Sequence, residues 1–167
     1  MGKVQILAVL TMDGCLSSEL YDKAHQDLCL DRCGLDEIRK KAFYRVTPDY
    51  SISMLHEWRK DCTNIRYLAE ATPDTADYIN GLLRMHAVDE IILYTVPFIS
   101  GSGRHFFKSA LPEQHWTLSS LKSYPNGVCR IIYILDKKQD SQNVRQAYIS
   151  IFRNRINVPI TNNLSRR

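Results

Sequence analysis

The sequence contains no apolar segment long enough to cross a membrane. Its longest stretch without a charged residue runs from Ile91 to Gly103, 13 residues that include a proline, whereas a membrane helix needs about 20 apolar residues. The opening MGKVQILAVLTMDG lacks the length and the small-residue cleavage site of a secretory signal. We therefore expect a cytoplasmic protein without a membrane partner.

Cysteine is scarce, and its spacing indicates neither a disulfide framework nor a zinc ribbon. The five cysteines are an odd number and include no C-x-x-C pair. His25, Cys29 and Cys33 recur every fourth residue, but on one helix the outer two would lie about 12 Å apart, too far to share one zinc ion. Reduced thiols are the expectation.

Sequence motifs of several enzyme classes are also missing. The chain has no G-x-x-x-x-G-K-[ST] and no H-E-x-x-H, so neither nucleoside triphosphate hydrolysis nor zincin chemistry has support. The pair Gly101 and Gly103 is not a dinucleotide fingerprint, because Phe106 stands where the third glycine belongs and no helical pattern follows. With 7 Gly and 6 Pro in 167 residues, the composition is that of a globular domain.

Acidic residues nearly disappear from the last part of the chain. Residues 137–167 hold seven Lys/Arg but a single acid, Asp140. Apolar residues at helical spacing predict an amphipathic helix over 139–154. Two parts are therefore predicted: a domain of residues 1–136, and a C-terminal amphipathic helix with a basic tail at 137–167. The tail can meet phosphates or acidic surfaces, or be a solvated helix face; we do not expect nucleic acid as a partner.

Three apolar runs predict buried strands. Lys3–Leu10 (KVQILAVL) and Glu90–Ile99 (EIILYTVPFI) are almost continuously apolar, as in strands covered on both faces. A further run at 64–70 precedes a helical pattern, for which Thr72 is a candidate cap and Pro73 a candidate first residue. This order predicts a β-α-β unit with parallel strands.

The remaining segments predict helices and a hairpin. Strands at His115–Leu121 and Val128–Leu135 are joined by KSYPNG, a strong turn signal. Apolar spacing predicts helices near 17–29, 35–43 and 51–62, with YRVTPDYS at 44–51 as a connection. Together these elements predict an α/β fold whose sheet ends antiparallel.

Two loops stand out as candidate ligand sites. They follow the carboxyl ends of two predicted buried strands, where open α/β sheets bind ligands. Glycine in such loops lets backbone N–H groups approach a phosphate or a flat ring; the alternative is that both loops are simply tight turns. The loops are Thr11-Met12-Asp13-Gly14 and Pro97 to Gly103, with Gly101, Ser102 and Gly103 at its end.

The segments KVQILAVLTMDGCLS, AVDEIILYTVPFISGSGRHFF and PNGVCRIIYIL together resemble the dihydrofolate-reductase-like superfamily. Within it, they look most like the RibD C-terminal family, the reductase domain of riboflavin biosynthesis. That family's S-[LM]-D-G-x-[IL] is matched from Thr11 to Leu16, and its V-D-E-[ILV] from Val88 to Ile91. Its P-x-[IL]-x-G-x-G followed by an aromatic is matched from Pro97 to Phe106. The resemblance covers residues 3–16 and 64–136.

The resemblance implies a three-layer α/β/α fold with a mixed sheet and an antiparallel C-terminal hairpin. It also implies that NADPH reduces a pterin-like or ribosylaminopyrimidine ring, as in 5-amino-6-(5-phosphoribosylamino)uracil reductase or dihydrofolate reductase. No catalytic side chain is assigned, because hydride transfer needs only two rings held face to face. Exposed sheet edges and the late helix suggest a homodimer. The implied cofactor-binding residues are Thr11, Met12, Asp13, Gly14, Glu70, Ala71, Thr72, Pro97, Gly101, Ser102 and Gly103.

The sequence departs from this family where the cofactor phosphates bind. The usual Gly-Gly pair is replaced by Glu70-Ala71-Thr72, and the middle G-R-x-T segment has no counterpart between Gly34 and Ser51. Two functions therefore stay open. One is a reductase of a small heterocycle; the other is a catalytically inactive ligand- or partner-binding module, acting through its basic tail or as a dimer. In the reductase, nearby cations would replace the lost phosphate contacts: Arg32, Arg39, Lys40, Lys41 and Arg45.

Overall fold

The computed structural model describes residues 1–16, 28–61, 64–108 and 110–136. The chain separates into two units, Met1–Leu135 and Asp136–Arg167. The predicted C-terminal helix and basic tail lie outside the described residues, so their separation as a part of their own stays a prediction. Most of the helix predicted near 17–29 lies outside them as well.

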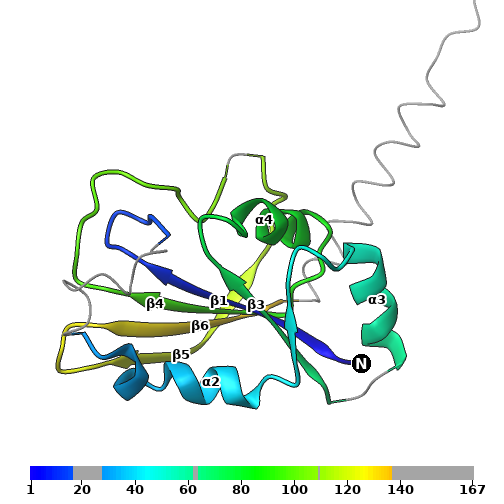
Figure 1. The fold of residues 1–167 in the computed structure, drawn as a ribbon, viewed down its shortest axis with the longest axis horizontal. Helices are drawn as coiled ribbons and strands as arrows, with labels where there is room; N and C mark the ends of the chain where they lie inside the picture. Colours follow the sequence, from blue (N-terminus) through cyan, green and yellow to red (C-terminus); the bar gives the residue numbers. More distant parts are fainter. Residues whose placement is uncertain (17–27, 62–63, 109, 137–167) are drawn as a thin grey trace, which may run out of the picture. The chain divides into compact units, whose positions relative to one another are not determined.

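Within the described residues, six strands form one mixed sheet in the order β2-β3-β1-β4-β6-β5 (Figure 1). Strands β2, β3, β1 and β4 pair in parallel, whereas β6 runs antiparallel to both β4 and β5. The predicted hairpin at one edge of the sheet is confirmed. The strands are β1 Lys3–Leu10, β2 Tyr44–Val46, β3 Arg66–Ala71, β4 Glu90–Thr95, β5 Trp116–Ser123 and β6 Cys129–Leu135.

Strand β1 lies in the middle of the parallel part, between β3 and β4. Ile6 is in register with Ala69 on one side and with Ile91 on the other. Every residue of β1 after Lys3 is buried, which explains why its sequence is apolar at all of these positions except Gln5 rather than alternating. The chain from β3 to β4 passes over β1, so the predicted β-α-β unit is confirmed, with one strand inserted between its two strands.

Helices cover both faces of the sheet and give three layers (Figure 1). Helices α3 (Ile52–Asp61) and α4 (Ala76–Arg84) lie on one face, where the even residues of β1 pack with Ile79 and Leu82. The short 3-10 helix η1 (Leu30–Cys33) and α2 (Leu35–Lys41) lie on the other face, where Leu7 and Val9 pack with Leu35. The predicted α/β/α architecture is confirmed.

Two of the predicted strand boundaries are wrong. The segment at 44–51 is not only a connection, because its first residues form the edge strand β2, where Tyr44 pairs with Tyr67 and the two rings stack at 5.8 Å. Strand β4 ends at Thr95 rather than at Ile99. Pro97 has no N–H to continue a ladder, and the chain turns there toward the end of β1.

Two predicted helix ends also differ. Helix α4 begins at Ala76 with Thr75 at its N-cap, so Thr72 and Pro73 are neither cap nor first residue. The Thr75 hydroxyl donates a hydrogen bond to the Glu70 carbonyl oxygen at 2.7 Å. This bond holds the residues before Ala76 in a turn, so the helix begins three residues later than predicted. Cys29 has a left-handed backbone (φ 42°) directly before η1, so no continuous helix carries Cys29 and Cys33.

A buried ion pair closes the amino-terminal edge of the sheet. Arg59 of α3 and Asp89 before β4 are both almost fully buried, with Nη2 and Oδ2 2.6 Å apart. Arg59 also donates to the Ala87 carbonyl at 2.8 Å, and Asp89 accepts the Val4 N–H at 2.9 Å. This pair therefore ties α3, β1 and β4 together at the end of the sheet opposite the candidate site.

Candidate functional site

The two loops predicted from the sequence meet at the carboxyl ends of β1 and β4. Leu10 and Thr95 are in register at the ends of these neighbouring parallel strands. The Met12 N–H donates to the Phe98 carbonyl at 2.7 Å. The prediction that the loops lie in contact is confirmed; whether they bind a cofactor stays a prediction.

Asp13 joins the two loops through its carboxylate. Its Oδ2 accepts the Gly101 N–H at 2.9 Å, and its Oδ1 accepts the Ser100 N–H at 3.2 Å and the Thr11 hydroxyl at 2.5 Å. The Thr11 hydroxyl, helped by the two N–H groups, holds the pKa of Asp13 well below its usual range. Asp13 is therefore ionised at neutral pH and holds the loops together.

The two glycines of the second loop differ in their surroundings. Gly101 has a positive φ of 67°, and a Cβ built there would have no atom within 4 Å. Gly103 has a φ of 133°, and its Cβ would come within 3.4 Å of Cys15 Cβ. A side chain at position 101 would thus enter open space, whereas one at position 103 would touch Cys15 and would need a backbone conformation that favours glycine.

Cys15 lies next to Asp13. Its side chain is buried, and its Sγ lies 3.7 Å from Asp13 Oδ2. Burial, and next the negative charge of Asp13, raise the pKa of the Cys15 thiol. The thiol therefore ionises less readily than that of an exposed cysteine.

The residues in place of the usual glycine pair end β3. Glu70 is held by Arg39 of α2, with Nε at 3.2 Å and Nη2 at 2.9 Å from the two carboxylate oxygens. Arg45 of β2 lies 3.8 Å from the same carboxylate. The sequence assigned Arg39 and Arg45 to the cofactor phosphates, whereas here both pair with Glu70.

The turn between β3 and α4 uses its own backbone donors. The Thr72 N–H donates to Thr75 Oγ1 at 2.8 Å, and the Thr75 N–H donates to Thr72 Oγ1 at 3.3 Å. Pro73 between them has no N–H. A pyrophosphate bound at this turn would therefore find few backbone donors available.

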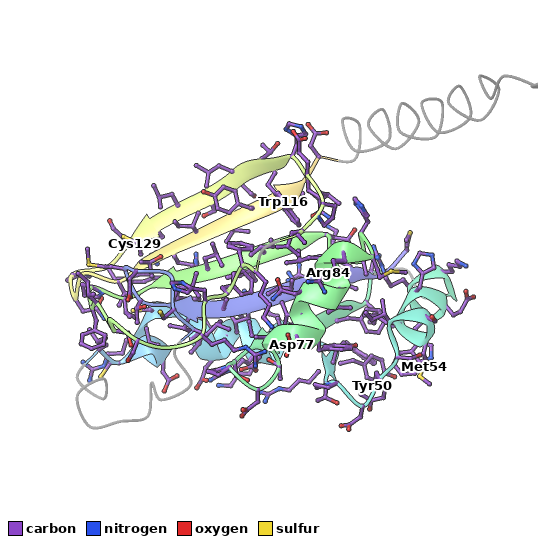
Figure 2. All side chains as sticks on the ribbon, turned by 90° about the horizontal axis from the view of Figure 1, so that it is seen from above. Tyr50, Met54, Asp77, Arg84, Trp116 and Cys129 are labelled. Atoms are coloured by element: carbon purple, nitrogen blue, oxygen red, sulfur yellow. The ribbon has the colours of Figure 1, made fainter. Side chains whose placement is uncertain are left out.

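Two cations that the sequence interpretation did not assign lie beside the same turn. Arg104 donates to the Pro73 carbonyl at 2.6 Å and pairs with Asp77, in the first turn of α4. Lys108 pairs with the same carboxylate, which Figure 2 labels on α4. Arg104 and Lys108 could have been found from the sequence, because both follow the second glycine loop. Hydrogen bonding to these cations lowers the pKa of Asp77.

The site fits NADPH in part. Open backbone at Gly101 suits the approach of a flat nicotinamide ring. At the phosphate end, two clusters flank the turn: Glu70 with Arg39 and Arg45, where Arg39 also pairs with Asp36 at 3.7 Å, and Asp77 with Arg104 and Lys108. Only the Asp77 cluster has more cations than carboxylates, and the backbone donors of a glycine pair are missing.

Other kinds of site find no support in the part of the chain that the structure describes. There, no group of three or more His, Cys, Asp or Glu side chains is placed to hold a metal ion. Nor is any described helix both long enough and apolar enough to cross a membrane.

Comparison with known proteins finds similarity at the level of structure only. No family model matches the sequence, and no curated protein matches it. A Thermotoga maritima diaminohydroxyphosphoribosylaminopyrimidine deaminase/5-amino-6-(5-phosphoribosylamino)uracil reductase is similar with a TM-score of 0.54 at 10% identity, over 81% of this chain and 57% of that one. RibD of Acinetobacter baumannii has a TM-score of 0.52 at 12% identity, over 82% and 59%. A protein assigned to riboflavin biosynthesis in Shewanella sp. PV-4 has a TM-score of 0.50 at 11% identity, over 81% and 99%.

These similarities establish the fold. The chain has the dihydrofolate-reductase-like fold that the sequence predicted. It spans somewhat more than half the length of the two bifunctional or RibD chains and almost the full length of the third.

Proposed function

We propose that this protein is an NADPH-dependent reductase of a small heterocycle, of the pterin-like or ribosylaminopyrimidine class. The observation that carries the proposal is the Asp13 carboxylate, which binds the Ser100 and Gly101 N–H groups and so joins the two loops at the carboxyl edge of β1 and β4. The fold is shared with a protein named as a 5-amino-6-(5-phosphoribosylamino)uracil reductase, which supports the same reaction class.

The residues of the cleft would bind and orient rather than react. NADPH, when bound, supplies a hydride. Backbone groups of Thr11 to Gly14 and the open position at Gly101 would border the two rings and exclude water between them. Asp13 has no proton to donate at neutral pH, so we assign it as a positioning residue.

The cofactor phosphates would lie beside the β3–α4 turn. Arg104 and Lys108 would hold them there, in exchange for part of their pairing with Asp77. Charged side chains on a surface turn are weaker anchors than a cradle of backbone N–H groups at a helix N-terminus. We therefore expect NADPH affinity to be poor for a reductase.

One titration tests the proposal. NADPH is titrated by calorimetry, and its oxidation is followed with a dihydropterin precursor or a ribosylaminopyrimidine as acceptor. We expect saturable binding and turnover that Gly101→Val greatly reduces, because the valine side chain fills the open position. Glu57→Gln, in an exposed pair with Lys60 on α3, is the control and should leave both unchanged. Absence of NADPH oxidation with both acceptor classes would contradict the proposal.

A second candidate function is supported by the β3–α4 turn. The N–H groups of Thr72 and Thr75 are already used within the turn, and Pro73 has none. A chain that had lost cofactor binding but kept the cleft would act as a ligand- or partner-binding module. Such a module would bind the heterocycle with the same affinity whether or not NADPH is present. It would not oxidise NADPH.

A further inference from the structure

His105 lies directly beside the first loop of the candidate site. Two backbone hydrogen bonds fix the segment that contains it: the Leu16 N–H donates to the Arg104 carbonyl at 2.7 Å, and the Phe106 N–H donates to the Gly14 carbonyl at 3.2 Å. The Phe106 side chain is buried and anchors the segment, whereas the His105 side chain is exposed. The backbone of His105 is therefore held in place while its ring stays accessible.

The ring of His105 lies against Gly14. Its Nδ1 is 3.7 Å from the position that a Cβ on Gly14 would occupy, an ordinary van der Waals distance. Gly14 ends the loop whose backbone would border the heterocycle in the proposed function. Because the ring is exposed and glycine has no side chain to shield it, a molecule held over this loop can reach the imidazole.

Reduction of a heterocycle needs a proton as well as a hydride. When a C=N or C=O double bond accepts a hydride at carbon, the electron pair of the broken π bond goes to nitrogen or oxygen, which must then take a proton. Asp13 has no proton at neutral pH. The Cys15 thiol is buried, and its raised pKa makes it a poor proton donor. The Arg104 guanidinium keeps its protons and pairs with Asp77. None of these groups is suited to supply the proton.

We propose that His105 donates this proton as the general acid of the reaction, a proposal that rests on the reductase function. An imidazole is half protonated near pH 6.5, so it transfers a proton readily at neutral pH. The imidazolium gives its N–H proton to the nitrogen or oxygen of the substrate, becomes neutral, and regains a proton from water after the product leaves. The charged groups on the segments packed around it are Asp13, Arg104, Asp77 and Lys108, each held by N–H groups or by an ion pair.

The pH dependence of the wild type and of His105→Gln tests the proposal. Glutamine keeps a polar side chain but has no proton that titrates near neutral pH. With dihydrofolate as acceptor, the single-turnover rate of NADPH oxidation by the wild type should be constant at acidic pH and fall above about pH 6.5. His105→Gln should be about 100-fold slower, without this break in its profile and with nearly the same affinity for the acceptor. His56→Gln is the control, since His56 is exposed on α3 and outside both loops.

NMR gives a second readout that needs neither NADPH nor turnover. In carbon-13 spectra of histidine side chains, the signal that is missing from His105→Gln identifies His105 in the wild type. Titration with dihydrofolate, and separately with a ribosylaminopyrimidine, should shift this signal in a saturable way for at least one of the two. The signal of His56 should stay in place in both titrations.

The outcomes separate this inference from the reductase proposal. Equal rates and equal pH profiles for the wild type and His105→Gln would overturn the inference, because the proton would then come from water, and would leave the reductase standing. Turnover together with a His105 signal that neither acceptor moves would also overturn it. Absence of turnover by the wild type contradicts the reductase itself and removes the proton transfer with it, whether or not the His105 signal moves.

Discussion

Asp13 Oδ2 and the Gly101 N–H lie 2.9 Å apart, although the two residues are 88 positions apart in the chain. This bond joins the loop after the first strand to the loop after β4. The carboxylate accepts two N–H groups that the glycine loop directs toward it, so the contact between the two loops depends on one charged side chain.

Asp13→Asn should weaken this connection in a pH-dependent way. The pKa of Asp13 is lowered in the folded protein, so its contribution is complete at neutral pH, begins to fall as pH drops through about 4, where the unfolded residue titrates, and is lost only when pH reaches the lower pKa of the folded protein. The wild type should melt above Asp13→Asn at pH 7, and the difference should shrink toward pH 3. Melting curves across this range test it; a constant difference would contradict it.

Alanine at the two loop glycines should have unequal effects on stability. Gly101→Ala meets no atom, so it should cost only the left-handed backbone strain of about 1–2 kcal/mol. Gly103→Ala has a backbone that L residues rarely adopt and also crowds Cys15, so it should cost more than Gly101→Ala. Urea unfolding compares them, and equal losses would show that the Cys15 contact is unimportant.

Glu70→Gly combined with Ala71→Gly should improve NADPH binding. The change releases Arg39 and Arg45 from Glu70 and removes two side chains, so that a phosphate can approach the backbone N–H groups before α4 more closely. Each charge-assisted hydrogen bond gained should raise affinity by about tenfold or more. Glu70→Gln alone is the control, because it frees the arginines without adding glycine. If calorimetry finds no gain from the double variant, the phosphates do not bind at this turn.

The buried pair of Arg59 and Asp89 should be important for stability. Arg59→Met leaves the Asp89 carboxylate buried without its cation, at a cost of about 3–5 kcal/mol. Breaking the exposed Glu57–Lys60 pair on the same helix, by Glu57→Gln, should change the free energy of unfolding very little. Denaturant unfolding of both variants tests this, and similar losses would contradict the assigned role of burial.

We expect the protein to form a homodimer through its hairpin edge. Leu118 and Leu121 on the edge strand β5 are 52% and 63% exposed. Exposed apolar side chains on an unpaired strand edge favour burial against a second copy of the chain. Light scattering after size exclusion should give twice the mass of one chain, and Leu121→Lys should reduce it to one. Ser120→Lys, also on β5, is the control for added charge. A monomeric wild type would contradict the prediction.

Local sequence pattern was sufficient for the buried strands and for the meeting of the two loops. The apolar runs of β1 and β4 need cover on both faces, and parallel neighbours necessarily end at the same edge. Strand β2 has only three residues and no alternation; it exists because Tyr44 pairs and stacks with Tyr67. The local sequence of β2 does not predict this strand, because its pairing partner, Tyr67, lies in a distant part of the chain.

The errors at α4 and at the phosphate end have the same origin. Thr72 and Pro73 form a good local start signal, but Thr75 bonds back to Glu70 and postpones the helix. Arg39 was assigned to a phosphate because its charge was visible in the sequence, whereas its partner, Glu70, is 31 residues away. Side-chain pairing across that distance cannot be read from spacing.

The position of β1 between β3 and β4 has a consequence for synthesis of the protein. The two strands that pair with β1 are synthesised long after it. The ribosome finishes β3 at Ala71 and β4 at Thr95. At translation rates of about 5–20 residues per second, a strand of seven buried residues waits about 3–12 s for its first partner. During that time its apolar side chains lack both strand partners, so β1 depends on other cover until β3 has been made.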